Sequence, residues 1–184
     1  MMDSQIGKSG AKLVLPSARL QQSFLAAMEE FADEGRHGDD SMIGRDMECF
    51  GPAWRTPKGF AAFLAKLEEV RHTPPHEGFV CSTTWWWAED DEFIGRIAVR
   101  HELNERLLEA GGHIGYDVRR SRRREGHATR MLAAVLPEAR KLGIGRVLLT
   151  CAPDNVASRR VIEANGGVLE DQRGELLRFW IAEA

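Results

Sequence analysis

Apolar side chains recur along the chain at two spacings, one typical of helices and one typical of strands. In the first third the helical spacing dominates, with Ser17 able to cap one helix and Thr56-Pro57 able to begin another. The polar stretch between these helices has only weak helical potential and is expected to be a loop. The elements predicted here are a strand over 12–15, a helix over 18–33, a loop over 34–51 and a helix beginning at 56.

From Pro74 onward the pattern changes to strand-like runs, and helical spacing returns later in the chain. Asp90-Asp91 forms a polar turn between two such runs and predicts an antiparallel hairpin. Pro137 lies inside the longest later helix, where it removes one backbone hydrogen bond and predicts a kink near Ala133. The elements predicted here are strands over 78–88, 93–99, 113–118, 146–151, 168–171 and 176–181, a connection over 103–112, and helices over 127–142 and 157–165.

The length of 184 residues suits a single domain over 11–184, preceded by a loose polar N-terminus over 1–10. No apolar run approaches the length that spans a membrane, and no signal-peptide core is present, so a cytoplasmic protein is expected. Cys49, Cys81 and Cys151 are odd in number and far apart. They indicate reduced thiols, and neither a disulfide framework nor a metal site is expected.

The net charge of −3 is unevenly distributed. Residues 1–112 hold 12 basic and 19 acidic side chains, whereas residues 113–184 hold 13 and 9. A basic C-terminal part suits an anionic cofactor, and an acidic N-terminal part suits a cationic partner. The alternative is that the asymmetry lies on solvated faces and has no bearing on partners.

The richest chemistry lies in the turn over 118–129, where a strand ends and a helix begins. The motif Arg123-x-x-Gly126-x-Ala128 lies within it, and residues 119–124 include five arginines. Gly126 has no Cβ and Ala128 has only a methyl group, so the backbone can approach a ligand closely. The first N–H groups of the following helix point into the same turn and favour an anion. Together these features indicate a site for a diphosphate.

Other phosphate-binding patterns are absent from this turn. It lacks the Gly-x-x-x-x-Gly-Lys-Ser/Thr of a P-loop, and it lacks the Gly-x-Gly-x-x-Gly of dinucleotide-binding folds. The arginines could instead form a solvated charge run or bind nucleic acid. Nucleic acid is the weaker interpretation, because the whole chain is acidic and no aromatic residues are interleaved with the arginines.

The order strand, Arg123-x-x-Gly126-x-Ala128, helix resembles the acetyl-coenzyme A signature of the GNAT superfamily of N-acetyltransferases, Gln/Arg-x-x-Gly-x-Gly/Ala. The flanking segments extend the resemblance over roughly residues 93–181. A little-characterised subgroup is more similar still, since it shares Arg-His-Glu-Leu-Asn at 100–104 and Glu-Ala-Asn-Gly-Gly at 163–167. The resemblance implies an α/β (α+β type) acyl-coenzyme A N-acyltransferase fold, with a central mixed, mostly antiparallel sheet flanked by helices.

The resemblance also implies which residues hold the cofactor. In this family the turn binds the pyrophosphate of coenzyme A, and the fourth strand and the helix after the fifth strand contact the pantetheine arm. The alternative is that Asp154, Asn155 or Ser158 is present only to cap that helix. The residues implied to bind the cofactor are Tyr116, Asp117, Val118, Arg123, Arg124, Gly126, His127, Ala128, Thr129, Asn155 and Ser158.

The groups that would move protons are less clearly marked. An amine must lose a proton to attack a thioester, and the departing thiolate must gain one. The tyrosine that many family members place after the fifth strand corresponds here to Ile162, which cannot donate a proton. Tyr116, the only tyrosine of the chain, is either the acid or a core residue. Glu102, after the third strand, is the candidate base, with Asp117 and His113 as alternatives.

The resemblance therefore implies an N-acetyltransferase that moves an acetyl group from acetyl-coenzyme A to a primary amine by direct attack in a ternary complex. The acceptor would be a small molecule or a peptide, and neither nucleic acid nor a membrane is expected as a partner. The alternative is a non-catalytic module that binds or senses acyl-coenzyme A. Trp85-Trp86-Trp87 cannot all face inward from one strand, which leaves a homodimer or an aromatic ligand open.

Overall fold

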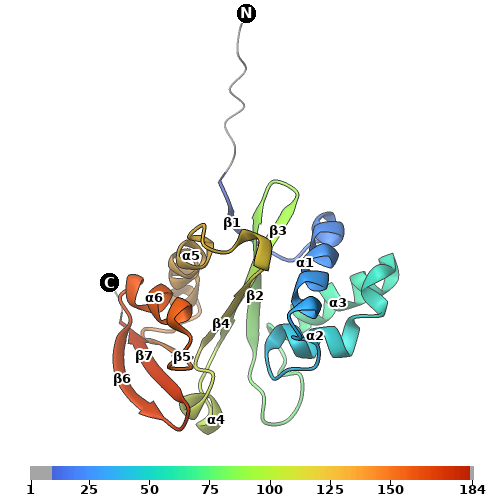
Figure 1. The fold of residues 1–184 in the computed structure, drawn as a ribbon. Coiled ribbons are helices and arrows are strands. Elements are labelled where there is room, and N and C mark those ends of the chain that lie inside the picture. The colour runs from blue at the N-terminus through green and yellow to red at the C-terminus, as the bar shows by residue number, and fades with distance from the viewer. Residues whose placement is uncertain (1–9, 183–184) are drawn as a thin grey trace, which may run out of the picture.

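Helices pack around two antiparallel sheets in the computed structural model, which describes residues 10–182 (Figure 1). The predicted loose N-terminus lies outside the described residues except for Gly10. The strands are β1 (Lys12–Val14), β2 (Ser82–Glu89), β3 (Glu92–Arg100), β4 (Ile114–Val118), β5 (Val147–Cys151), β6 (Val168–Arg173) and β7 (Leu176–Ile181). The helices are α1 (Gln21–Asp33), α2 (Met42–Phe50), α3 (Pro57–Glu69), α4 (Glu105–Glu109), α5 (His127–Lys141) and α6 (Val156–Ala164), with 3₁₀ turns η1 (Ala18–Leu20), η2 (Ala53–Arg55) and η3 (Arg120–Arg122).

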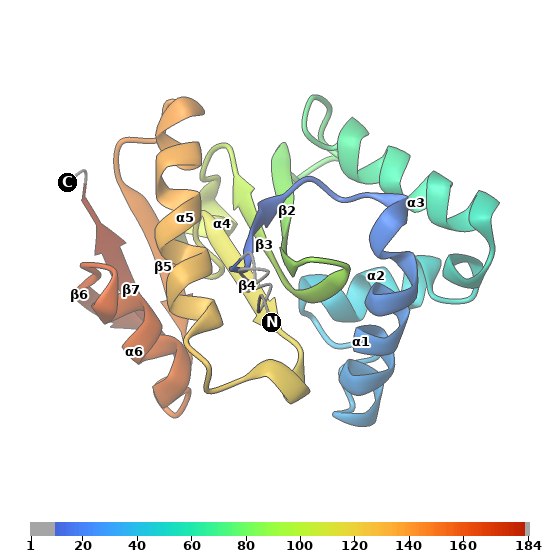
Figure 2. The ribbon, with the colours of Figure 1, turned by 90° about the horizontal axis from the view of Figure 1, so that it is seen from above.

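The first sheet has the strand order β1-β2-β3-β4, and the second has the order β5-β7-β6. Every strand pairing among the described residues is antiparallel. Helices α1, α2 and α3 lie on one side of the first sheet and α5 lies on the other (Figure 2). The predicted α/β fold, with mostly antiparallel strands flanked by helices, is thereby confirmed, although the strands form two sheets instead of one central sheet. Within residues 10–182 no helix combines the length and the apolar character needed to cross a membrane.

Both faces of β2 are buried, which corrects one expectation about its tryptophans. Trp86 lies in the apolar core formed with α1 and α3, stacked 5.0 Å from the ring of Phe24. Trp87 belongs to the core on the α5 side, and Trp85 packs against that same core. Trp86 and Trp87 are buried and Trp85 is partly buried, because helices cover the sheet on both sides. The predicted homodimer therefore has no support from these tryptophans and stays a prediction.

Two segments expected to be irregular contain helices. The loop predicted over 34–51 includes α2, which Ser41 caps by accepting the Gly44 N–H at 3.0 Å. The connection predicted over 103–112 includes α4, which Asn104 caps in the same way at the Leu107 N–H. Each helix buries only a few apolar side chains, so their sequence signal was weak, and packing against the sheet stabilises them.

Strands β4 and β5 are joined at their beginnings only. The His113 N–H donates to the Leu148 carbonyl at 2.8 Å, and the Leu148 N–H donates to Nδ1 of His113 at 3.0 Å. Further along, β4 pairs with β3 alone and β5 with β7 alone among the described strands. The far end of β4 thus keeps one backbone edge free, and the candidate site lies at that end.

Candidate functional site

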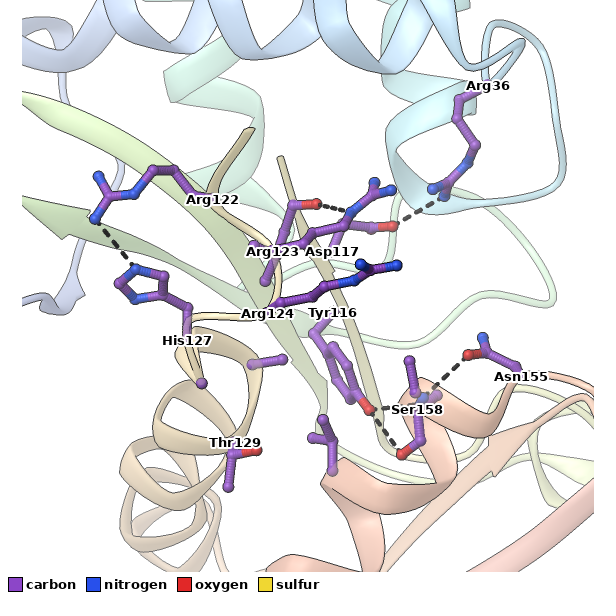
Figure 3. Close-up of a pocket in the computed structure, with 15 residues that line it drawn as sticks. Arg36, Tyr116, Asp117, Arg122, Arg123, Arg124, His127, Thr129, Asn155 and Ser158 are labelled. Atoms are coloured by element: carbon purple, nitrogen blue, oxygen red, sulfur yellow. Dashed lines mark hydrogen bonds and ion pairs between the residues drawn. The ribbon is translucent and has the colours of Figure 1, made fainter. Parts of the chain in front are cut away.

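A cavity of about 640 Å³ opens between the end of β4 and the start of α6 (Figure 3). The loop after α1 and the turn before α5 complete its walls. Every residue predicted to bind the cofactor lines this cavity. They are Tyr116, Asp117, Val118, Arg123, Arg124, Gly126, His127, Ala128, Thr129, Asn155 and Ser158.

The turn before α5 offers a run of free backbone donors. Arg124 and Gly126 have positive φ angles of 65° and 75°, so the chain turns sharply before α5 begins. Within residues 10–182 no acceptor is found for the N–H groups of residues 124–129, and the Arg130 N–H is the first to donate, to the Gly126 carbonyl at 3.1 Å. Free N–H groups at the start of a long helix favour an anion, because the helix dipole is positive there.

Most arginines of the turn already have carboxylate partners, which the sequence did not reveal. Of the five arginines over 119–124, only Arg120 and Arg124 form no ion pair within residues 10–182, and of these two only Arg124 lines the cavity. A ligand in the cavity therefore meets one guanidinium without a counter-ion, and the other arginines mainly hold the turn in place. The paired ones are Arg119 with Glu30, Arg122 with Glu89, Glu92 and Glu125, and Arg123 with Glu34.

His127 is a buried neutral side chain that fixes the first turn of α5. Its Nδ1 accepts from Nε1 of Trp87 at 3.0 Å and from Arg130 at 2.9 Å, so the ring proton is on Nε2, 3.2 Å from the Glu125 carboxylate. Burial lowers the pKa of His127, with Arg130 acting in the same direction. The imidazole is thus occupied within the fold, and only the backbone N–H of His127 is available to a ligand.

Tyr116 connects β4 with the start of α6, which Asn155 caps. The Tyr116 hydroxyl lies 2.9 Å from Oγ of Ser158, and Asn155 caps α6 by accepting the Ser158 N–H at 3.0 Å. Burial raises the pKa of Tyr116 to about 12. The phenol of Tyr116 therefore stays protonated near neutral pH. The hydrogen bond from Ser158 confirms the predicted capping role of Asn155.

The candidate bases occupy different surroundings. Asp117 lines the cavity and accepts from Nη2 of Arg36 at 2.9 Å. His113 is buried, and burial together with Arg100 lowers its pKa to about 4. Glu102 is exposed on the loop after β3 and does not line this cavity. Its role as the base stays a prediction.

Four further residues line the cavity and were missed from the sequence: Arg36, Arg122, Ala157 and Val161. Ala157 and Val161 lie four residues apart on α6, on the face that includes Ser158, so helical spacing could have identified them. Arg36 gave no signal, since it is a single arginine in a stretch expected to be a loop.

A family model described as an acetyltransferase (GNAT) domain matches residues 36–168. Among curated proteins none matches the chain. Solved structures share the fold at low identity. RimJ of Mycobacterium smegmatis, in complex with a coenzyme A disulfide, is 19% identical with a TM-score of 0.65, over 94% of this chain and 81% of that one. RimL, a ribosomal L7/L12 α-N-protein acetyltransferase in complex with coenzyme A, is 14% identical with a TM-score of 0.66, over 95% of each chain.

Proposed function

Because the chain belongs to the GNAT acetyltransferase family and is therefore an acyltransferase, we propose that it moves the acetyl group of acetyl-coenzyme A to a primary amine by direct attack in a ternary complex. One observation carries the choice of donor: the free N–H groups of residues 124–129 lie beside the unpaired Arg124 in one cavity. This set fits a diphosphate, since backbone donors and a guanidinium both favour a multiply charged anion. The cavity of about 640 Å³ is also of ordinary size for a ligand site.

We expect the pantetheine arm of coenzyme A to lie along the free edge of β4. The Arg100 N–H donates to the His113 carbonyl and the Arg119 N–H donates to the Ile94 carbonyl, so alternate residues of β4 face β3. Tyr116 and Val118 consequently direct their backbone groups away from β3, toward the open edge. Bound acetyl-coenzyme A supplies an activated thioester, and this edge would hold and orient it.

The side chains around β4 suggest how protons are handled. Cysteine-like thiols have pKa values of about 8.5, so a phenol with a pKa of about 12 gives up its proton to a thiolate only at a cost. We therefore expect Tyr116 to position α6 against β4, with the departing thiolate taking its proton from the amine or from water. Among the carboxylates considered as base, Asp117 lies at the cavity and Glu102 does not, which favours Asp117.

We also propose that the protein is located in the cytoplasm. Cys49, Cys81 and Cys151 are all free thiols in the fold. Free thiols suit a reducing compartment, where disulfides are rare.

Thermal unfolding of the protein with increasing acetyl-coenzyme A, followed by thiol release with a panel of primary amines, tests the proposal. A ligand at 100 times its dissociation constant stabilises the folded state by about 2.7 kcal/mol, so binding should raise the melting temperature measurably. Absence of any shift at millimolar acetyl-coenzyme A would contradict the proposal. A shift without thiol release for any amine would point to the alternative, a module that senses acyl-coenzyme A.

A further inference from the structure

A second cavity, of about 320 Å³, lies on the opposite face of the first sheet. Its floor is formed by β2 and β3, and α2 and α3 cover it. Figure 2 shows these two helices on the side of the sheet away from α5. No part of the proposed coenzyme A site extends into this space, so the cavity needs a separate explanation.

Two residues that line the second cavity lie close to the strand that would hold the thioester. A Cβ added to Gly115 of β4 would lie 2.7 Å from Cε of Met42 and 4.0 Å from Nη2 of Arg100. Met42 and Arg100 both line the second cavity, whereas Tyr116, the next residue of β4, lines the first. Residues that line the second cavity therefore lie against β4 at Gly115, and β4 separates them from the first cavity. A molecule in the second cavity would approach the acyl group from the face opposite to coenzyme A.

The second cavity is strongly basic. Asp46 is the only acidic side chain among the residues that line it. Asp46 pairs with Arg96, whose side chain is only 5% exposed. Nε of Arg96 is also buried and has no hydrogen-bond partner. The cationic side chains around the cavity are Arg45, Lys66, Arg96, Arg100 and Arg106.

Arg100 is the strongest indication that this cavity favours an anion. Its Nη1 donates to the carbonyls of Gly111 and Gly112 at 3.0 and 2.9 Å, both neutral acceptors. No carboxylate among residues 10–182 forms an ion pair with it. Burial and then the neighbouring arginines, led by Arg45, lower its pKa to about 10. The Arg100 side chain is half-buried. Partial removal of a cation from water without a counter-ion is costly, and a bound anion would lower that cost.

We propose that this cavity holds the anionic group, a carboxylate or a phosphate, of the amine acceptor. The inference rests on the proposed function, because it assigns the acceptor of the same reaction. Phe50, Phe63 and Phe79 also line the cavity, so the acceptor has an apolar body beside its acidic group. A volume of about 320 Å³ is at the small end for ligand sites and suits a body of amino-acid size.

Binding without turnover is the first test. Thermal unfolding is followed at constant ionic strength with 3-phenylpropanoate, with phenyl phosphate and with neutral 3-phenylpropanamide. We expect one or both anions to raise the melting temperature and the amide to have no effect. Arg100→Gln and, independently, Arg45→Gln should remove the shift, so the test survives if one variant folds poorly. Arg140→Gln, at an exposed position of α5 that lines neither cavity, is the matched control and should keep it.

Turnover is the second test, with ω-amino carboxylates and ω-amino phosphates compared with the corresponding amides. Charge-assisted hydrogen bonds predict a kcat/KM at least about tenfold higher for the acidic acceptor, and this preference should be lost in Arg100→Gln. Equal rates for acid and amide would overturn the inference while the proposed function stands. Anion binding without any acetyl-coenzyme A binding would contradict the proposed function, and it would leave an anion site that does not belong to an acetyl acceptor. If neither anion shifts the melting temperature more than the amide, the cavity is not an anion site.

Discussion

Glu30 of α1 should be a principal anchor of the turn that precedes α5. Its carboxylate accepts from Nε of Arg119 at 2.9 Å, and from the N–H and Oγ of Ser121 at 2.9 and 2.8 Å. The side chains of Glu30 and Arg119 are only 18% and 11% exposed. These contacts join α1 to the segment that begins the candidate diphosphate site, although the residues lie about ninety positions apart in the chain.

Glu30→Gln keeps the size of the side chain and removes its charge. Removing one partner of a buried ion pair lowers the free energy of unfolding by about 3–5 kcal/mol. Glu30 is partly exposed, and the Glu92 carboxylate lies 3.8 Å from Arg119, so we expect a smaller loss of about 2–3 kcal/mol here. Glu29→Gln is the matched control, since Glu29 and its partner Arg55 are 63% and 67% exposed and surface pairs contribute about 0–1 kcal/mol. Urea unfolding at pH 7 measures both variants.

The effect should depend on pH. Burial acts to raise the pKa of Glu30, but the hydrogen bonds from Arg119 and Ser121 outweigh it, so the pKa is lowered from its ordinary value of 4.5. A lowered folded-state pKa means that the pair contributes its full stability above pH 4.5 and loses it as the pH falls through the folded value. The gap between wild type and Glu30→Gln should therefore shrink in acid. A gap at pH 7 no larger than that of Glu29→Gln would refute the reasoning.

The remaining predictions concern the site itself. Arg124→Ala should weaken acetyl-coenzyme A binding by about tenfold or more, as measured by calorimetry, whereas Arg120→Ala should change it by less than about twofold. Tyr116→Phe should lower kcat by less than about tenfold, because it loses one neutral hydrogen bond; a loss of about a hundredfold would make the hydroxyl the acid. Asp117→Asn should lower kcat by about a hundredfold. Glu102→Gln should change kcat by less than about twofold, and a loss of about a hundredfold in this variant alone would restore Glu102 as the base.

The residues that line the first cavity could be selected from the sequence because their signal is local. The end of β4, the turn and the start of α5 are continuous in the chain. The small residues Gly126 and Ala128 indicate a sharp turn whose backbone a ligand can approach closely. Helix α2 could not be selected in the same way. Ile43 and Met47 are its only large buried apolar residues, so its stability comes from packing against elements that are distant in sequence.

The tryptophans show a second limit. Period-two alternation correctly separates Trp86 from Trp85 and Trp87. The same pattern fits a strand with one exposed face and a strand covered on both faces. Only the order of layers decides between them, and that order depends on where α1, α3 and α5 pack.

The distribution of charge along the chain was the least reliable guide to the charges that a ligand meets in the fold. The acidic N-terminal part of the chain was expected to suit a cationic partner, yet Glu30, Glu34, Glu89 and Glu92 pair with the arginines of the turn. Much of the asymmetry is thus neutralised inside the fold. What remains is a set of arginines with too few carboxylates around the second cavity. Since an arginine with a counter-ion holds structure and one without it attracts an anion, the acceptor side of this enzyme should favour acidic amines.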